Sequence, residues 1–559
     1  MSDQLRKEKI TEAYREAVTD FKTDSGIPVK ELYTQDDLAG INVHEDIGLP
    51  GEYPFTRGHH PKMYRGKLWN IRNITGLSTP KAYNERLRYL IGQGMTAIEC
   101  ELDNPTFYGL EPDQPAADGH LGVCGTCLHS LKDVEEMLEG LPLDALSFSS
   151  APAVPDVSQA YILTAMKHGC DINKLRGLAL IPHFYLFNTC VPDQEYITFL
   201  NGRTSTIFRW SNDFLEYICR NLSKWNGWYS SGYDIREAFC DAVQEIAYSI
   251  AIRNETIREM VRRGIDVNVA AQKLMPVLSV SQDFFEEVAK FRAARKIWAA
   301  TLKRDFGVTD QNALCLRFHA NIAGSSFTRQ QPLVNLMRGT LGCLAGVLGG
   351  AMGIQVPSYD EAWATPSEDA ATLAVRTQQI IRYESGVPRV ADPMAGSYYV
   401  EWLTNEMAQK IEAEVDKIEK MGGWLEAMRT GWVKRELEKS QIALQGKIES
   451  GEKPVIGVNR FIIPPEEDFK PKRYAPDVSK EVEPYLAEYV EWRDKKRDKE
   501  KVKRALEKLY NIAGKTNDSL VPCVFEALEA DVTFAEIRGV LRMVDGLEYD
   551  WAGERKDPF

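Results

Sequence analysis

Two cysteines separated by two residues are the first side chains in this sequence whose spacing could support chemistry. Cys124 and Cys127 flank a Gly-Thr dipeptide, and His120 and His129 lie close by. Thiolate and imidazole groups at such spacing can hold zinc or form a redox pair. A structural zinc site would want a second cysteine pair, which the neighbouring sequence lacks. We therefore interpret both cysteines as incidental thiols and expect no metal site.

The tripeptide Gly514-Lys515-Thr516 resembles the end of a P-loop, whose backbone cradles nucleotide phosphates. A P-loop requires another glycine five positions before Gly514, where this sequence has Leu509. The surrounding residues have a helical pattern. We interpret the match as chance.

The overall composition limits the functions that the chain can have. With 559 residues, 44% of them hydrophobic, it is long enough for a barrel-sized domain of ~250 residues with sizeable additions. A net charge of −13 argues against nucleic acid as a general partner. Residues 340–356 are apolar but short and contain five glycines, so we expect no membrane span. Ten scattered cysteines without an N-terminal signal segment indicate a cytoplasmic protein.

Any site must be positioned by the surrounding elements, and between residues 64 and 400 short apolar runs alternate with longer helical stretches. The expected strands are 96–102, 145–150, 178–182, 227–231, 313–319 and 353–356. Expected helices between them include 80–92, 130–140 and 281–303. Such alternation favours a parallel α/β fold, and a closed (β/α)8 barrel of the TIM type is its commonest form at this size. An open doubly wound sheet is the alternative.

Serines occur on these expected strands where a barrel usually carries bulky residues. Ser147 and Ser149 lie on one strand, and Ser230 and Ser231 lie on another. A lumen lined by such small side chains could admit a ligand chain instead of packing shut. The alternative, which the pattern alone favours, is that they face outward or lie at strand ends.

Three regions follow one another along the chain. Residues 1–50 are expected to form an N-terminal arm that contacts a partner subunit, residues 51–410 the barrel, and residues 411–559 a helical C-terminal region. In the arm, a helical stripe is formed by Ile10, Tyr14, Ala17, Val18 and Phe21. In the C-terminal region, the mixed-charge run 492–510 is typical of a solvated helix face.

Seven stretches together resemble the methylmalonyl-CoA mutase family, in the form of its large subunit. They are EDIGLPGEYPFTRG (45–58), MYRGKLWNIRNITG (63–76), WNGWYSSGYDIREA (225–238), FFEEVAKFRAARKIWA (284–299), YDEAWATPSEDA (359–370), RTQQIIRYESGVPRVADPMAGSYYVEWLT (376–404) and KPVIGVNRF (453–461). They occur in the family's order and cover nearly the whole chain. The resemblance implies an isomerase that rearranges the carbon skeleton of a CoA thioester by radical chemistry with adenosylcobalamin. It also implies a barrel through which the pantetheine chain of CoA threads.

The resemblance also implies a partner. In the family, the cobalamin-binding domain is marked by Asp-x-His-x-x-Gly, whose histidine becomes the lower cobalt ligand. The nearest match here, Asp118-Gly-His120-Leu-Gly122, is one residue short and lies inside the barrel region. We therefore expect a separate, small cobalamin-binding subunit to supply the ligand, in a heterodimer or heterotetramer.

Most functional positions of the family carry matching residues. Those that match CoA-binding positions are Lys62, Lys67, Arg72, Ser149, Asn226 and His319. Those that match positions around the adenosyl group and corrin are Glu237, Glu361, Ala362, Gly324 and Asn321.

The acyl pocket departs from the methylmalonyl-CoA mutases. Ile74 replaces a tyrosine, Asp234 replaces the histidine that bonds the thioester carbonyl, and Leu180 aligns best with a glutamine. Glu101 stands at the position of a small residue, and with Ile74 it resembles the hydroxyacyl branch, the 2-hydroxyisobutyryl-CoA mutases. Asp234 fits neither branch, and the family's carboxylate-binding arginine falls in 183–209, which does not align.

These changes predict a substrate other than methylmalonyl-CoA. One alternative is that Glu101 and Asp234 are ordinary acids at strand ends, each bonded to a backbone group. The other is a diverged, non-catalytic CoA-binding or scaffold subunit of a mutase complex.

Overall fold

The computed structural model of the protein describes residues 21–150, 155–180, 199–200, 203–228 and 230–559. Eight strands form one parallel sheet: β1 (Asn70–Thr75), β2 (Ala97–Cys100), β3 (Ser147–Ser150), β4 (Arg176–Leu180), β7 (Trp225–Trp228), β8 (Val277–Val280), β9 (His319–Ile322) and β10 (Gly353–Gln355). A separate antiparallel hairpin joins β5 (Phe199–Leu200) to β6 (Arg203–Thr204). Within the sheet each strand pairs with its neighbours in chain order, and β10 pairs with β1.

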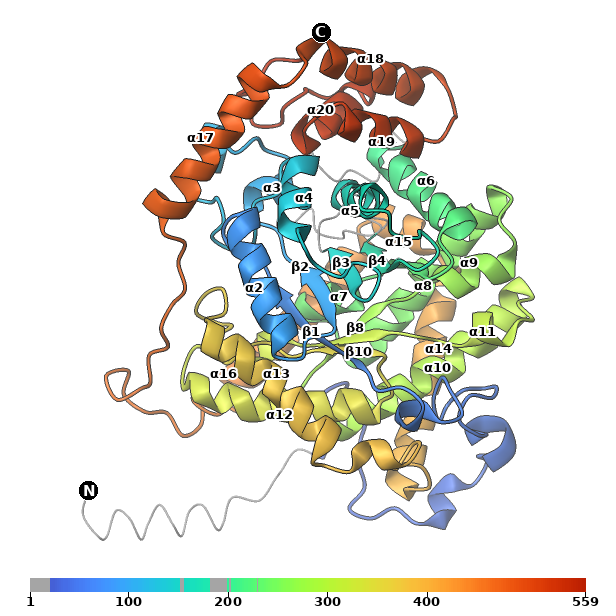
Figure 1. The fold of residues 1–559 in the computed structure, drawn as a ribbon. Coiled ribbons are helices and arrows are strands. Elements are labelled where there is room, and N and C mark those ends of the chain that lie inside the picture. Colours follow the sequence, from blue (N-terminus) through green and yellow to red (C-terminus); the bar gives the residue numbers. More distant parts are fainter. Residues whose placement is uncertain (1–20, 151–154, 181–198, 201–202, 229) are drawn as a thin grey trace.

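The two edge strands of this sheet, β7 and β8, approach each other and close it. Isolated bridges join Gly227 to Leu274 and Ser231 to Val277. The Met275 N–H donates to the Gly227 carbonyl at 3.1 Å. The curled sheet and its shell of helices (Figure 1) confirm the predicted (β/α)8 fold and not the open sheet.

Helices cover the outside of the barrel (Figure 1). In the first half these are α2 (Pro80–Gly92), α3 (Asn104–Tyr108), α4 (Leu131–Leu138), α5 (Asp156–Lys167), α6 (Thr206–Asn221), α7 (Gly232–Glu237), α8 (Ala242–Arg262) and α9 (Val267–Lys273). In the second half they are α10 (Phe284–Phe306), α11 (Gln311–Leu314), α12 (Asn335–Leu348) and α13 (Glu368–Tyr383). The remainder are α14 (Tyr398–Lys420), α15 (Trp424–Arg429), α16 (Trp432–Glu449), α17 (Glu483–Glu491), α18 (Lys499–Lys515), α19 (Val521–Glu529) and α20 (Phe534–Val544).

Helix α2 illustrates how the sequence sets these elements. The Thr79 hydroxyl accepts a hydrogen bond from the Ala82 N–H at 3.3 Å, and Pro80 occupies the first turn. Tyr83, Leu87 and Leu90, at positions i, i+4 and i+7, are completely buried and form the face that packs inward.

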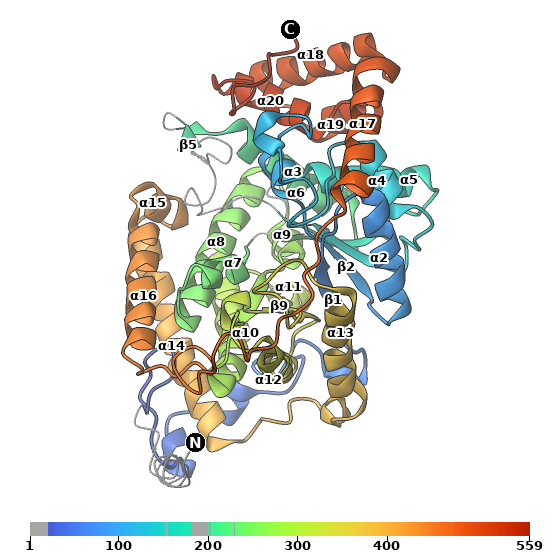
Figure 2. The same ribbon diagram turned by 90° about the vertical axis from the view of Figure 1, so that its left-hand side faces the viewer.

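The two largest hydrophobic cores formed by the described residues lie outside the barrel. One joins β1–β4 and their helices to the C-terminal helices α18–α20. The other joins β8–β10 to α8, α10, α12 and α14–α16. Both views show the C-terminal helices, in red, stacked at the α3–α6 end, and Figure 2 shows α14–α16 along the left of the view, across from α2 and α13. The predicted boundary at residue 410 falls inside α14, and the division into regions remains a prediction.

The buried carboxylate of Glu111 helps to tie the C-terminal helices to the barrel. The hydroxyls of Tyr489 and Thr533 donate to it at 2.8 and 2.5 Å, and Arg555 pairs with it at 2.8 Å. Burial raises the pKa of Glu111, but Arg555 and Arg493 outweigh burial and hold that pKa below its ordinary value. Removing this charge would leave Arg555 with Glu536, 4.0 Å away, as its remaining partner, whereas Arg493 would keep Asp113.

Most expected elements are present with shifted boundaries. Helix α2 matches the expected 80–92, and β2, β3, β4, β7 and β10 overlap expected strands. The expected strand 313–319 is wrong for most of its length. There Asp310 caps the short helix Gln311–Leu314, and β9 begins only at His319. Strands β1 and β8 are absent from the expected set.

Residues 340–356, the apolar run of the sequence, form the end of α12 and strand β10. No helix in the described parts of the chain is long and apolar enough to cross a membrane. The predicted helical stripe of the arm lies almost entirely outside the described residues.

Candidate active site

Arg72 on β1 shows which side chains face the lumen of the barrel. Its Nη2 lies 2.6 Å from Glu99 Oε1 on β2 and donates to Ser149 Oγ on β3 at 3.3 Å. Its Nη1 donates to Asn321 Oδ1 on β9 at 3.4 Å. Because β3 and β9 are not neighbours of β1, these side chains can meet only inside the barrel.

The strand register extends this inner surface around the barrel. One line of register partners is Ile74, Glu99, Ser149, Leu178 and Asn226. A second line is Arg72, Gln355, Asn321 and Ser279. Of the two alternatives for the strand serines, Ser149 thus follows the lumen-facing one. Ser230 instead donates to Ser249 on α8, outside the barrel.

Several buried polar atoms of this inner surface have no hydrogen-bond partner among the described residues. They are Arg72 Nε, Ser279 Oγ, His319 Nδ1 and Gln355 Oε1. Burial and the charge of Arg72 hold the pKa of His319 well below its ordinary value, so the ring is neutral and can accept a hydrogen bond. Leaving a buried polar group unpaired costs about 1–3 kcal/mol. A row of such atoms therefore indicates a polar ligand chain.

Basic side chains gather where the strands begin. Lys67 precedes β1 by three residues, Arg176 is the first residue of β4, and Lys224 directly precedes β7. All three are exposed, as is Lys62 on the turn before Lys67. Parallel strands of a barrel all begin at the same end. This N-terminal opening can therefore bind phosphate groups.

Carboxylates gather at the opposite, C-terminal opening. Glu101 follows β2, Asp234 and Glu237 lie on α7, and Glu361 follows β10. Burial, and then the charges of Glu99, Asp234 and Glu361, hold the pKa of Glu101 well above its ordinary value. Burial raises the pKa of Asp234 to about 6. Glu361 is exposed at its surface, and desolvation by the neighbouring protein, followed by the charges of Asp360 and Glu237, raises its pKa to about 7. Near neutral pH this opening therefore offers carboxyl groups both as donors and as acceptors.

Helix α7 and the end of β9 hold Glu237 in place. The Ser325 N–H and hydroxyl donate to its two carboxylate oxygens at 2.8 and 3.1 Å. A Cβ on Gly324 would lie 3.4 Å from the Tyr233 hydroxyl and 3.6 Å from Glu237 Oε2. The glycine therefore keeps space open beside the carboxylate.

The Cys-Gly-Thr-Cys segment has a structural role at the same opening. It lies between the chain segments that follow β1 and β2, where Thr126 N–H donates to the Glu101 carbonyl at 3.1 Å and Cys127 Sγ donates to the Ser78 carbonyl at 3.2 Å. A Cβ on Gly125 would collide with the Leu102 backbone at 2.2 Å. The described residues contain no cluster that could hold a metal ion. The segment thus fixes the backbone of Glu101.

A buried charge network supports α7 from behind. Lys290 pairs with Glu245 at 2.8 Å and also with Glu287, whose Oε1 lies 3.4 Å from Nη2 of Arg236 on α7. Glu245 accepts from the Ser279 N–H at 2.6 Å, and Lys290 donates to the Ser279 carbonyl at 2.7 Å. At this level β7 has ended and the chain has entered α7. The network therefore supplies hydrogen-bond partners for the backbone N–H and carbonyl of Ser279 on β8.

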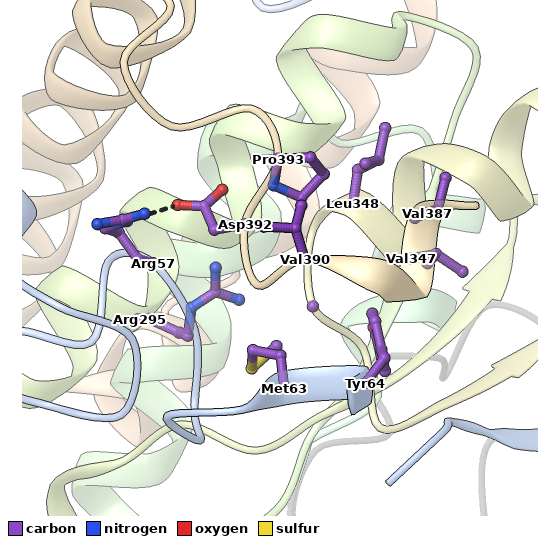
Figure 3. Close-up of a pocket in the computed structure, with 11 residues that line it drawn as sticks. Arg57, Met63, Tyr64, Arg295, Val347, Leu348, Val387, Val390, Asp392 and Pro393 are labelled. Atoms are coloured by element: carbon purple, nitrogen blue, oxygen red, sulfur yellow. Dashed lines mark hydrogen bonds and ion pairs between the residues drawn. The ribbon is translucent and has the colours of Figure 1, made fainter. Parts of the chain in front are cut away.

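Outside the barrel, the described residues line a small cavity and a larger cleft. The cavity in Figure 3, between Arg57, Tyr64 and Asp392, has a volume of about 10 Å³, which is room for one water molecule. A cleft of about 600 Å³ lies between α6 and α8, but its arginines are already paired, as Arg263 is with Asp213 at 2.6 Å. Neither hollow offers groups comparable to those of the lumen.

Comparison with known proteins agrees with this geometry. Residues 22–547 match the family described as methylmalonyl-CoA mutase. The chain belongs to the methylmalonyl-CoA mutase family. It is 36% identical to the 2-hydroxyisobutanoyl-CoA mutase large subunit of Aquincola tertiaricarbonis, covering 96% of this chain and 93% of that protein. It is 32% identical to methylmalonyl-CoA mutase of Rhizobium meliloti (94% and 72%) and 31% identical to the human mitochondrial enzyme (94% and 68%). The prediction of an acyl-CoA mutase, an isomerase, is confirmed.

In this family member, the structure brings many predicted site residues together. Glu101, Asp234, Glu237, Glu361 and Gly324 surround the C-terminal opening. Ser149, Asn226 and His319 lie along the lumen, and Lys62 and Lys67 lie at the N-terminal opening. The roles that the resemblance gives them remain predictions.

Other predicted residues lie apart from their expected groups. Arg72 is buried in the lumen, away from Lys62 and Lys67. Asn321, expected near the cofactor, is bonded to Arg72 in the lumen. Ala362 is exposed next to Glu361, and the side chain of Leu180 lies outside the described residues.

Glu99, which is 1% exposed and faces the lumen, was not predicted from the sequence. A strand directs every second side chain to the same face. Glu101 was predicted to lie in the pocket, so the residue two positions before it could have been found from strand periodicity alone. Ser279 and Gln355 lie on β8 and β10, and no chemical motif singles them out.

Proposed function

We propose that this chain is the substrate-binding large subunit of an adenosylcobalamin-dependent acyl-CoA mutase, with the CoA thioester extending along the barrel. The observation that carries the proposal is the row of unpartnered buried polar atoms between the basic and the acidic opening. Arg72 Nε–H and the Ser279 hydroxyl can donate to amide carbonyls, while Gln355 Oε1 can accept from amide N–H groups. The phosphates would then meet Lys62 and Lys67.

The acyl group would lie at the acidic opening, and we infer that it bears a hydroxyl and not a carboxylate. Desolvating a carboxylate beside Glu101 and Asp234 would cost several kcal/mol, a penalty of the order found for buried like charges. The stretch 183–209, where the family's carboxylate-binding arginine falls, contains two arginines, Arg203 and Arg209, and the Arg209 guanidinium already donates to the Ala513 and Asp518 carbonyls. A substrate hydroxyl can donate to Asp234 and accept from the protonated carboxyl of Glu101. An ammonium group is the other substituent that these acids could hold.

The C-terminal opening also fits the adenosyl group of the cofactor. The space beside Gly324 is lined by Glu237, whose carboxylate Ser325 holds in place and which can accept from ribose hydroxyls. Glu361 can accept in the same way. When bound, adenosylcobalamin supplies the radical that removes a hydrogen atom from the substrate. The residues of this chain orient the acyl group and keep water from it.

A second, small subunit would present the cobalamin and its cobalt ligand. The support is the similarity that extends along 93% of a relative named as a large subunit. In the single-chain methylmalonyl-CoA mutases of Rhizobium meliloti and human mitochondria, the match covers 72% and 68%.

The test is to reconstitute the chain with a cobalamin-binding subunit and to compare turnover of 2- and 3-hydroxyacyl-CoAs, isobutyryl-CoA and methylmalonyl-CoA without oxygen. We expect a hydroxyacyl-CoA to be fastest, and Glu101→Ala to slow it. Faster turnover of methylmalonyl-CoA than of all the others would contradict the substrate proposal. No turnover of any thioester, with CoA still bound, would favour a scaffold role.

A further inference from the structure

The carboxylate of Glu99 lies at the inner end of the acyl pocket. It is the register partner of Ile74, and its charge acts on both Glu101 and Asp234. Glu99 is 1% exposed, so solvent screens its charge very little. Its counterion is Arg72, which is equally buried and lies 2.6 Å away.

Arg72 is the cation that an acyl carboxylate in this part of the lumen would otherwise meet. Its remaining contacts are with the neutral groups Ser149 Oγ and Asn321 Oδ1. Within the described residues Glu99 is the one carboxylate that pairs with it. A second carboxylate would enter a site whose positive charge is already neutralised and where Glu101 and Asp234 add repulsion.

We propose that Glu99 is a specificity-determining residue that excludes carboxylate-bearing acyl groups by pairing with Arg72. The inference rests on the proposed function, because it places the acyl group at this end of the lumen. The selectivity against acyl carboxylates is thereby assigned to the Arg72–Glu99 pair, which lies between the CoA channel and the acyl pocket. Removal of the Glu99 charge would leave a buried guanidinium unpaired, and a ligand carboxylate could then replace the lost partner.

The experiment measures binding to the chain alone, without cofactor, by calorimetry. Isobutyryl-CoA and methylmalonyl-CoA are the probes, because they differ by a methyl group in place of a carboxylate. We expect the native chain to bind isobutyryl-CoA at least tenfold more tightly. Glu99→Gln should shift this ratio at least tenfold toward methylmalonyl-CoA. The double variant Arg72→Gln/Glu99→Gln should lose that gain, because the guanidinium is absent.

Glu401→Gln is the matched control. It breaks a buried arginine–carboxylate pair of similar geometry, Arg292–Glu401 at 2.7 Å, outside the barrel. It should leave the binding ratio unchanged. If Glu99→Gln folds poorly, methylmalonyl-CoA should raise its melting temperature more than isobutyryl-CoA does, the reverse of the native order.

An unchanged ratio in Glu99→Gln, or equal thermal shifts, would overturn the assignment of Glu99 while leaving the proposed function intact. Failure of the native chain to bind either thioester, or CoA itself, would instead count against the proposed function.

Discussion

The N-terminal opening of the barrel presents lysine and arginine side chains, whereas the C-terminal opening presents carboxylates. Lys62 and Lys67 are exposed before β1, while Glu101, Asp234 and Glu237 are at least half-buried beyond the ends of β2 and β7. The difference gives an elongated ligand a direction. An anionic end group is attracted to one opening and repelled by the other.

The two openings also differ in how firmly their side chains are held. The basic residues stand on short turns and at strand beginnings, where long side chains remain free to move. The acidic residues are fixed by Ser325, by the Cys-Gly-Thr-Cys segment and by the network behind α7. Binding through diffuse charge at one end and fixed geometry at the other matches the usual division between anchoring a substrate and reacting with it.

Replacement of Asp234 should have the largest effect and should act at the acidic end alone. We expect Asp234→Ala to lower kcat on the order of 100-fold, the size of effect found when a positioned acid is lost. The affinity for CoA should stay within about twofold, because CoA has no acyl group to contact this residue. Steady-state kinetics of the reconstituted complex and calorimetry with CoA provide the two measurements. Equal losses in kcat and in CoA affinity would mean that the two ends of the barrel do not act independently.

Replacement of the lysines should act at the other end. We expect Lys62→Ala combined with Lys67→Ala to weaken CoA binding about tenfold at low salt, and less at high salt because exposed charges are screened. kcat at saturating substrate should change little. Lys439→Ala, which removes an exposed lysine paired with Glu436 on α16, is the control and should leave CoA binding unchanged. A salt-independent loss of affinity would contradict an anchoring role for the two lysines.

Arg236 tests the comparison of the two openings in another way, because it supports α7 from behind and does not face the acidic opening itself. Arg236→Gln removes the contact between α7 and Glu287, so Asp234 and Glu237 should lose their fixed positions. We expect kcat to fall about fivefold, a modest positioning effect, with CoA affinity unchanged. Arg236→Lys should restore part of the rate, because the positive charge beside Glu287 is kept. Full activity of Arg236→Gln would show that α7 is held by other contacts.

Much of the difference between the basic and the acidic opening could be predicted from the sequence, and particular residues show why the rest could not. Lys67 lies within, and Lys62 directly before, the stretch 63–76 that resembles the family, so their place before the first strand follows from the chain order. The pairing of Arg72 with Glu99, Ser149 and Asn321 brings together residues up to 249 positions apart. Such contacts depend on barrel closure, which no local pattern encodes. The start of β9 was misplaced for a local reason, since Asp310 starts a helix where apolar residues suggested a strand.

The two openings should also respond differently to a change in pH. Burial raises the pKa of Asp234 to about 6, so this group loses its proton as pH rises through 6 and then becomes an acceptor. Turnover should therefore rise several-fold between pH 5 and 7, as for a single ionisation. The affinity for CoA should show no pH dependence that Asp234→Asn removes, because CoA has no acyl group to contact this residue.

The stability contribution of Asp234 has the opposite sign. Since its folded pKa lies above the ordinary value, its contribution is greatest at low pH and is lost as pH rises toward and through 6. Asp234→Asn should abolish both this stability change and the matching inflection in the rate profile. An inflection near pH 6 that persists in Asp234→Asn would point to another group.

The smallest effect is expected from the cysteines beside the acidic opening. Cys124 is exposed, whereas Cys127 is completely buried and donates to the Ser78 carbonyl. Cys124→Ser should therefore leave stability and turnover unchanged. Cys127→Ser keeps a donor but buries a more polar group, and we expect it to lower the free energy of unfolding by about 1 kcal/mol. Thermal melts of the two variants give the comparison directly. If either variant lost bound zinc together with stability, the structural role of the Cys-Gly-Thr-Cys segment could not rest on hydrogen bonding alone. A large loss of turnover in Cys127→Ser without loss of stability would show that the segment does more than fix the backbone of Glu101.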